Sequence, residues 1–457
     1  MAGMTIARQP AAAPVPDQSV LDDVIQRARR LGASAADAIL VRSTSLSVSV
    51  RLGKTEMIER SESADLGLRV FKGNKQAVIA GSDFRTDRLD DMVTRVLAMA
   101  DATPEDPYAG IAAPEQVLRA FPSLDLAEPT EPAAEALIKA ATEAEAAALG
   151  VTGITNSEGG DASWGRSDVY LAASNGFAGG YSRTSCGVST TALAGEGTAM
   201  ERDYDYDSAT YWADLRDAAS IGRTAAERAV RALNPRRVSS QQVPIIFEAR
   251  EARDMVSHFL AAISGSSIAR KSSFLKERMG QAVFAPGIVI EEDPTIARGP
   301  RSRPFDGEGL KPFKGRLIDQ GVLTSWLLNL SSARQLGLAP SGHGSRGIGG
   351  PPGASTSNVW MHAGSAKVED MIADIKQGLF LTGVLGHGTN MVTGDYSRGA
   401  NGFWIENGKI THPVSELTVA GNLADMFKNM IPASDLDRRF GIDAPSLLIN
   451  GMTVAGQ

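Results

Sequence analysis

Cysteine is almost missing from this sequence of 457 residues, and its scarcity excludes a fold held together by disulfides. The single cysteine, Cys186, lies within a strand pattern, where a small buried side chain is more common than a nucleophile. Sparse cysteine is typical of a reducing compartment. We therefore expect a cytoplasmic protein.

Long apolar runs are also missing, so we expect no membrane-spanning segment. Residues 1–18 are rich in alanine and proline but lack the basic start and apolar block of a signal peptide. We interpret this stretch as a disordered tail.

An excess of basic residues is absent, since the net charge is -7. Binding to a phosphate backbone relies on clustered Lys and Arg, so we expect no nucleic-acid partner. The sequence contains no Gly-x-Ser-x-Gly motif, which excludes that type of serine hydrolase signature. The glycine-rich residues 341–350 lack the Gly-Lys-Ser/Thr ending of a phosphate loop.

Histidine is rare and scattered, and no two histidines lie at the spacing of a metal-ligand pair. The five are His258, His343, His362, His387 and His412. We therefore expect no catalytic residue, no cofactor and no metal site in this chain from its local motifs.

The chain is too long for one ordinary core, and its composition changes along its length. We predict an α+β fold: an N-terminal sheet-and-helix region followed by a large antiparallel, β-rich C-terminal domain with covering helices. The predicted divisions are an N-terminal α/β unit at 19–101, a linker at 102–132, a middle α/β unit at 133–237 and the β-rich domain at 238–457. The linker is proposed because Pro, Ala, Asp and Glu replace a sustained apolar period there.

Turn dipeptides and apolar periods predict individual elements. Helices are expected at 87–100, 133–149 and about 213–233. Turns are expected at Gly53-Lys54, Gly73-Asn74, Asn175-Gly176, Asn407-Gly408 and Asn450-Gly451.

A short strand from Pro244 leads into a predicted amphipathic helix that ends near Ile263. Its apolar residues recur at three-and-four spacing, which places them on one face and predicts burial. They are Ala252, Met255, Val256, Phe259, Leu260 and Ile263. The opposite face carries Glu251, Asp254 and His258, which suit either a solvated surface or a carboxylate-and-imidazole metal face. The solvated surface is the favoured interpretation.

Small and polar residues are dense between 386 and 406. Glycines beside strands let another backbone approach closely, so a peptide could add to a strand edge here by main-chain hydrogen bonds. Plain turns between core strands are the alternative. The candidate groove residues are His387, Asp395, Ser397, Arg398 and Asn401.

Together, several motifs resemble the TldD/PmbA family of metallopeptidase-associated proteins, also called modulators of DNA gyrase, and specifically its PmbA (TldE) branch. The resemblance covers essentially the whole chain after the tail. The motifs are residues 45–51, 67–71, 102–109, 305–309, 394–408 and 412–414.

This resemblance implies a cytoplasmic peptidase assembly in which a TldD-type subunit carries zinc on a His-Glu-x-x-x-His helix, with a later cysteine as third ligand. Counting back from Gly265, the two histidine positions fall near Val256 and Ala261, and the glutamate near Ser257. The cysteine position falls near Ala400. All four are replaced, so the resemblance implies zinc in the partner and none in this chain. The charge balance gives no support to the gyrase label.

The leading hypothesis is a PmbA/TldE-type subunit of a zinc metallopeptidase complex that degrades or processes unfolded peptides. Its partner is a TldD-type subunit in a heterodimer, or a second copy in a homodimer. One alternative is a peptidase with a relocated site, using His258, Glu251 and Asp254, or His387 with Asp395. Another is a homo-oligomeric peptide-binding scaffold without proteolysis.

Overall fold

The computed structural model describes residues 17–456, and six long strands form its first sheet, with every neighbouring pair antiparallel. The sheet order is β3-β2-β1-β4-β5-β6. The strands are β1 (Ala35–Arg51), β2 (Lys54–Lys72), β3 (Lys75–Gly81), β4 (Ile154–Ala173), β5 (Ala178–Ala194) and β6 (Glu201–Ala209). The turns predicted near Gly53, at Gly73-Asn74 and at Asn175-Gly176 are confirmed, because each lies between two paired strands.

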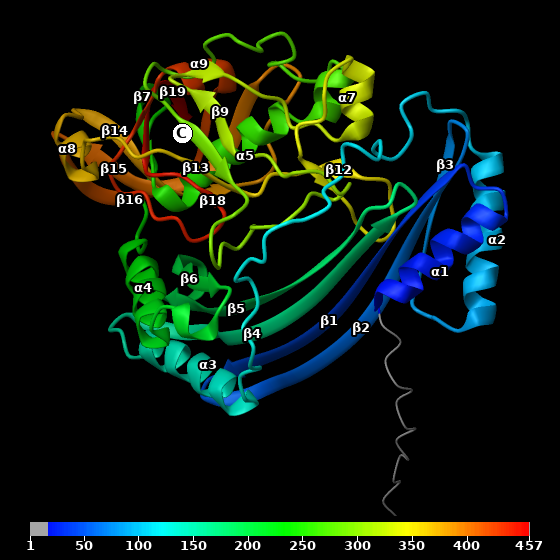
Figure 1. Ribbon diagram of the computed structural model, residues 1–457. Coiled ribbons are helices and arrows are strands. Elements are labelled where there is room, and N and C mark those ends of the chain that lie inside the picture. The colour runs from blue at the N-terminus through cyan, green and yellow to red at the C-terminus, as the bar shows by residue number, and fades with distance from the viewer. Residues whose placement is uncertain (1–16, 457) are drawn as a thin grey trace, which may run out of the picture.

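Two pairs of helices cover opposite ends of this sheet, as Figure 1 shows. They are α1 (Asp17–Arg30) with α2 (Thr86–Ala102), and α3 (Ala134–Leu149) with α4 (Ala218–Arg231). The apolar stripes of α1 and α2 pack on β1 to β3, with Val24, Val93 and Val96 fully buried. The predicted helices at 87–100 and 133–149 are confirmed.

Two predicted limits need correction. Asp17 and Gln18 belong to α1, so the tail predicted at 1–18 is wrong at its end, and residues 1–16 lie outside the described residues. The helix predicted at about 213–233 begins at Ala218, after a 3-10 turn at Trp212–Asp214. Asp217 caps it by accepting a hydrogen bond from the Ser220 amide, a start signal that the apolar period does not reveal.

The first sheet joins strands from both predicted α/β units, because β1 pairs along its length with β4. Residues 103–133 contain neither helix nor strand. They nevertheless bury Val117 and Leu126 and bond to both the sheet and the C-terminal domain. The proposed domain divisions stay predictions.

The largest sheet of the C-terminal domain closes on itself, because β16 pairs with both β15 and β19. Its order is β16-β15-β14-β7-β19-β17, and β7 with β14 is its parallel pair. The strands are β7 (Gln241–Phe247), β14 (Gln377–Leu385), β15 (Asp395–Glu406), β16 (Lys409–Asn422), β17 (Met430–Pro432) and β19 (Leu447–Ala455). The α+β class is confirmed.

A second C-terminal sheet has the order β10-β9-β8-β13-β18, and β11 pairs with β12. These strands are β8 (Ile290–Asp293), β9 (Gly315–Asp319), β10 (Val322–Leu323), β11 (Gly344–Ser345), β12 (Gly353–Ala354), β13 (Asn358–Met361) and β18 (Ile442–Asp443). The helices are α5 (Ala249–Ala262), α6 (Gly265–Ala269), α7 (Leu330–Leu336), α8 (Val368–Ala373) and α9 (Leu423–Lys428). None of the helices within residues 17–456 is long and apolar enough to cross a membrane.

The two Asn-Gly dipeptides of this domain behave differently. Asn407-Gly408 forms the predicted hairpin turn between β15 and β16, with φ of 50° and 76°. The turn predicted at Asn450-Gly451 is wrong, because β19 runs through it with a register shift between Ile449 and Met452. Gly451 has φ of 80°, so the left-handed residue serves a bulge instead.

Candidate functional site

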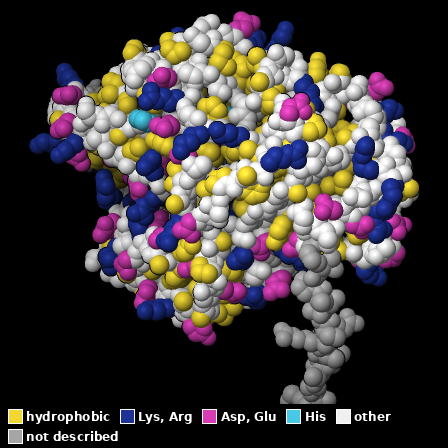
Figure 2. Space-filling model, in the orientation of Figure 1, with side chains coloured by type: hydrophobic (Ala, Val, Ile, Leu, Met, Phe, Trp, Pro, Cys, Tyr) yellow, Lys and Arg dark blue, Asp and Glu magenta, His cyan; other side chains and the backbone are white. Residues whose placement is uncertain are grey.

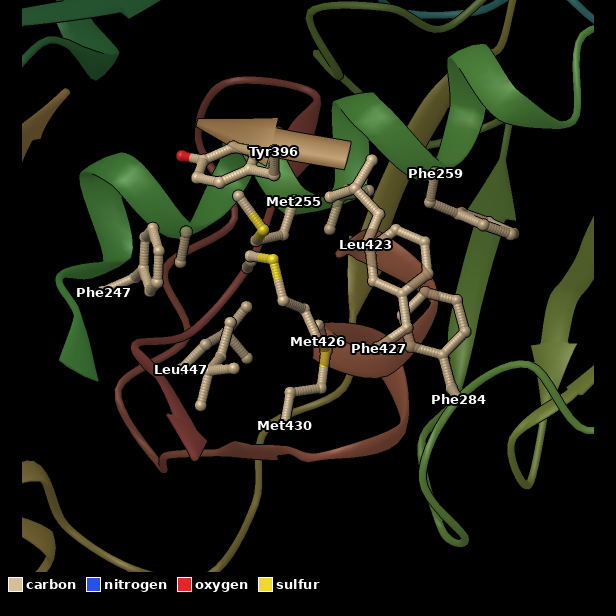
Figure 3. Packing of buried hydrophobic residues seen from close by; sticks show 14 of the residues in the cluster. Phe247, Met255, Phe259, Phe284, Tyr396, Leu423, Met426, Phe427, Met430 and Leu447 are labelled. Atoms are coloured by element: carbon tan, nitrogen blue, oxygen red, sulfur yellow. The ribbon is translucent and has the colours of Figure 1, made fainter. Parts of the chain in front are cut away.

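Helix α5 presents its predicted apolar face to the C-terminal core, which confirms that expectation. Met255 points toward Met426 of α9 (Figure 3), and Phe259 and Phe427 belong to the same buried cluster. The Phe259 ring meets the rings of Phe284 and Phe427 edge-on, at centroid distances of 5.2 and 6.4 Å. This face is filled by methyl, thioether and aromatic groups.

The opposite face of α5 is only partly the solvated surface that we expected: the Asp254 side chain is 44% exposed, while β15 contacts this face at Asp254 and His258. Arg398 of β15 donates to the Asp254 carboxylate over 3.0 Å. The His258 ring lies edge-on to Tyr396, with 5.9 Å between centroids. Tyr396 is itself buried, so a polar layer separates α5 from the strand.

Burial shifts the acid-base equilibria of this layer. It raises the pKa of Glu251 to about 7, since removal from water disfavours the carboxylate. It lowers the pKa of His258, because burial also disfavours the imidazolium. The His258 Nε2 atom is buried and has no hydrogen-bond partner among the described residues.

The predicted metal face does not assemble into a binding site. Among residues 17–456, no group of three or more His, Cys, Asp or Glu side chains is arranged to hold a metal ion. Asp254 is engaged by Arg398, and the Glu251 carboxylate lies 3.6 Å from Arg250.

The residues at the ligand positions that the sequence resemblance implies do not fit a zinc ion. Val256 is fully buried in the core, whereas Ala261 is exposed. Ser257 donates to the Arg253 carbonyl oxygen over 3.1 Å, within the helix itself. Ala400 is buried in β15. Aliphatic side chains offer zinc no lone pair, so no reaction step through a metal follows from these positions.

The predicted groove residues divide between two faces of β15. Asp395, Ser397 and Asn401 are exposed and alternate along the strand, while Arg398 lies on the face toward α5. His387 is exposed in the loop after β14. The pKa of Asp395 is lowered by hydrogen bonds from Thr393 and Asn422, and no contact among the described residues joins it to His387.

Strand β15 has no free edge for an added peptide strand. It pairs with β16 along one side and with β14 along the other. Beyond β14, the Ser397 amide donates to the Gly388 carbonyl oxygen over 2.7 Å. A Cβ on Gly388 would lie 1.5 Å from the Ser397 oxygen. The glycines therefore admit a close backbone, as predicted, but that backbone is the chain's own.

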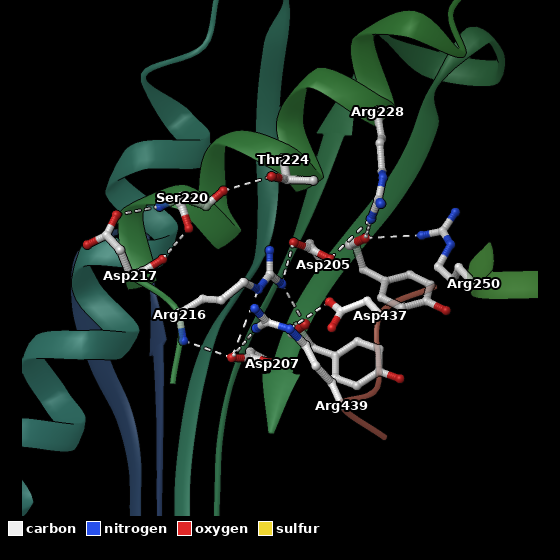
Figure 4. A network of polar contacts seen from close by, with 12 residues as sticks. Asp205, Asp207, Arg216, Asp217, Ser220, Thr224, Arg228, Arg250, Asp437 and Arg439 are labelled. Carbon is white, nitrogen blue, oxygen red and sulfur yellow. Dashed lines mark hydrogen bonds and ion pairs between the residues drawn. The ribbon is translucent and has the colours of Figure 1, made fainter. Parts of the chain in front are cut away.

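An edge strand of the first sheet, β6, carries several ion pairs to arginines of other elements. Asp203, Asp205 and Asp207 alternate along β6. Figure 4 shows Asp205 and Asp207 beside Arg250 and Arg439, which belong to the C-terminal domain. Arg250 of α5 bonds to Asp203 at 2.8 Å, and Arg216 bonds to Asp205 at 2.8 Å. Their period of two was the signal that could have revealed this face.

Arginines also cover the main-chain edge of β6. The Tyr204 carbonyl oxygen accepts hydrogen bonds from Arg228 and Arg250, at 3.4 and 3.2 Å. The Tyr206 carbonyl oxygen accepts one from Arg216 at 2.8 Å. Beside Arg228 and Arg250, a cavity of about 70 Å³ reaches Asn401, the one predicted groove residue that lines it.

Two buried groups with catalytic residue types are structural. His343 is fully buried between Ser341 and Glu292, at 2.7 and 2.9 Å, which resembles a serine hydrolase relay. The Ser341 hydroxyl also accepts a hydrogen bond from the Leu328 amide over 2.7 Å and lies 3.0 Å from the Trp326 carbonyl oxygen, so it is held within the fold. Burial raises the pKa of the Cys186 thiol to about 12, in agreement with a small core residue.

Comparison with known domains decides the family. The PmbA/TldA metallopeptidase domain 1 matches residues 36–100, the central domain matches 127–233 and the C-terminal domain matches 240–456. The chain belongs to the PmbA/TldD family. Its relatives include the metalloprotease PmbA of Escherichia coli O157:H7, which is 35% identical over 446 residues and 96% of this chain, or 97% of that protein.

Solved structures of the PmbA/TldD family share the fold. A candidate modulator of DNA gyrase from Bacteroides thetaiotaomicron superimposes with a TM-score of 0.89 at 25% identity, covering 96% of this chain and 99% of its own. TldE from Thermococcus kodakarensis superimposes with a TM-score of 0.85 at 19% identity, covering 96% and 100%. A peptidase-related role therefore follows from the family.

Proposed function

We propose that this chain is a PmbA/TldE-type subunit that carries no zinc and pairs with a TldD-type subunit in a cytoplasmic peptidase acting on unfolded peptides. One observation carries the proposal. The positions expected to hold zinc on α5 are a core valine, Val256, and an exposed alanine, Ala261. An isopropyl group and a methyl group have no lone pair to donate, so neither position can ligate zinc.

The role left to this chain is to shape the assembly and hold peptide. The boundary between β6 and the C-terminal domain, which we call the seam, supports this role. It contains two cavities lined by guanidinium groups and carboxylates. Such groups bind extended chains through hydrogen bonds and charge rather than through a fixed side-chain sequence. Acidic and basic side chains are intermingled over the face in Figure 2, so that face has no broad basic patch for nucleic acid.

The test uses the purified chain alone and together with the TldD-type chain of the same genome. We expect a complex on size-exclusion chromatography, and cleavage of an unstructured peptide only when both chains are present. Variants His258→Ala and His387→Ala of this chain should leave that cleavage intact. Loss of intrinsic activity in either variant would instead favour a relocated peptidase site.

A scaffold without proteolysis is separated by the same experiment. A chain that binds unfolded peptide but no TldD-type partner, and that forms only copies of itself, would contradict the proposed subunit. Unlike the relocated site, that outcome leaves the lone chain without cleavage activity.

A further inference from the structure

A second cavity along the seam, of about 210 Å³, is rich in arginine. It lies between β6, the first turn of α5 and residues 437–444. Figure 4 shows four of its arginines converging from different elements. The five that line it are Arg216, Arg228, Arg250, Arg253 and Arg439. Five guanidinium groups around one small cavity make it a candidate anion site.

Four of these arginines already have ion pairs, and some of the paired carboxylates lie just outside the cavity lining: Arg250 pairs with Asp203, Arg228 lies 3.8 Å from Glu248, and Arg216 and Arg439 lie 3.9 and 3.2 Å from Asp207. Two aspartates line the cavity itself, Asp205 and Asp437. Asp205 accepts from Arg216 and Arg228, at 2.8 and 3.1 Å. Asp437 bonds to Arg439 at 2.7 Å, and its side chain is 66% exposed. Solvent screens such an exposed partner strongly.

Arg253 is the arginine of this cavity with no ion pair to any described carboxylate. Its guanidinium lies over the Phe440 ring, 4.1 Å from the centroid, and donates to the Tyr206 hydroxyl over 3.2 Å. Asp443 is close in space, but it accepts the amides of Phe440 and Gly441 instead. These contacts fix the guanidinium and leave N–H groups free for a ligand.

The start of α5 brings backbone amides to the cavity, next to the carboxylates of Glu248 and Glu251 that lie 3.8 and 3.6 Å from Arg250. Ala249 and Arg250 are the first residues of α5, and both line the cavity. The first amides of a helix have no acceptor within the helix, and they form the positive end of its dipole. Fourteen residues of α5 are aligned behind this end. An anion in the cavity would therefore meet both backbone and side-chain donors.

We propose that this cavity binds a carboxylate of an extended peptide, through Arg253 and the start of α5. The carboxylate is either an acidic side chain or the peptide's C-terminal group. The cavity has room for one such side chain. The inference rests on the proposed function, since the peptide supplies the carboxylate.

The test measures binding of three unstructured fluorescent peptides of equal length by fluorescence anisotropy, using the full chain. One peptide has a glutamine and an amidated C-terminus, the second replaces that glutamine with glutamate, and the third keeps the glutamine but has a free C-terminus. At least one acidic peptide should bind roughly tenfold more tightly than the neutral peptide, because a charge-assisted guanidinium contact is worth about that much. The acidic peptide that gains identifies the source of the carboxylate.

The variant Arg253→Gln should abolish that preference and leave binding of the neutral peptide unchanged. Arg270→Gln is the matched control, because it removes one positive charge from an exposed position of the same domain. Arg253→Lys should restore part of the preference, and thermal unfolding shows whether each variant is folded. Equal binding of all three peptides, or a preference that survives in Arg253→Gln, would overturn the carboxylate site. Failure to bind any peptide would instead count against the proposed function.

Discussion

Arg398 on β15 and Asp254 on α5 form an ion pair with 3.0 Å between nitrogen and oxygen, although 144 residues separate them in the chain. This contact places β15 against the polar face of α5, while α9 packs against the apolar face. The apolar face of the helix is buried and its polar face is half-buried, and burial shifts the pKa values of Glu251 and His258 on that polar face.

The buried carboxyl of Glu251 predicts a pH-dependent stability. Its pKa is raised from 4.5 to about 7, so the folded protein holds a proton that the unfolded chain releases. This contribution is present at low pH and is lost as the pH rises from about 4.5 to about 7. Between pH 5 and pH 8, the variant Glu251→Gln should therefore gain up to about 3 kcal/mol relative to wild type. Thermal unfolding of both proteins at the two pH values measures this difference, and a difference that does not change with pH would contradict it.

We expect substitution of the buried Arg250 to lower stability more than substitution of the exposed Arg202. Arg250 has only 12% of its side chain exposed, and it bonds to Asp203 and to the Thr382 carbonyl oxygen. Replacing Arg250 with methionine leaves Asp203 without this partner. This should lower the free energy of unfolding by about 3–5 kcal/mol.

Arg202 provides the control for that variant, because its pair with Glu158 is exposed, at 58% and 47%. The variant Arg202→Gln should cost less than about 1 kcal/mol. Thermal unfolding, together with hydrogen exchange of the β6 amides, compares the two variants. Equal losses would show that the seam does not depend on the buried pair.

The aromatic cluster under α5 predicts a large cost for Phe259→Ala. The ring is fully buried against Phe284 and Phe427, so its removal leaves a cavity and should cost about 3–5 kcal/mol. Leu338 is 49% exposed, and Leu338→Ala should be nearly neutral. The shifts in melting temperature test this contrast, and a mild effect of Phe259→Ala would mean that the core collapses around the gap.

Backbone crowding predicts that an alanine is destabilising at Gly402 and tolerated at Gly349. Gly402→Ala would place a Cβ 2.2 Å from the Phe380 carbonyl oxygen, so β14 and β15 must separate and the protein should lose stability. Gly349→Ala meets no atom within 4 Å and should be tolerated. Melting temperatures of the two variants decide this, and a stable Gly402→Ala protein would show that the strands can shift without cost.

Local patterns predicted the fold better than the site. The apolar stripe around Val256 and the turn at Asn407-Gly408 depend on neighbours in sequence, and both are confirmed. The burial of His258 depends on Tyr396, which belongs to a strand far along the chain. Helical periodicity could therefore not reveal that His258 is buried. Asn450-Gly451 carried the same turn signal as Asn407-Gly408, because positive φ suits a bulge as well as a hairpin.

The arginine-rich seam was missed because its charges come from several elements. Arg216, Arg253 and Arg439 look like ordinary surface residues in their own segments, and only folding brings them to one cavity. The alternating aspartates of β6 were the available clue. The predicted groove on β15 failed as a strand-addition site for the opposite reason, since sequence does not show that both of its edges are already paired.

The zinc content of each subunit directly tests whether this chain lacks the metal site. The lone chain and its complex with a TldD-type partner are incubated with zinc, freed of unbound metal and measured by elemental mass spectrometry. We expect negligible zinc in the lone chain and about one zinc per complex, because a tetrahedral site needs donors that Val256, Ala261 and Ala400 lack. One zinc per lone chain, together with peptide cleavage by that chain, would contradict this expectation.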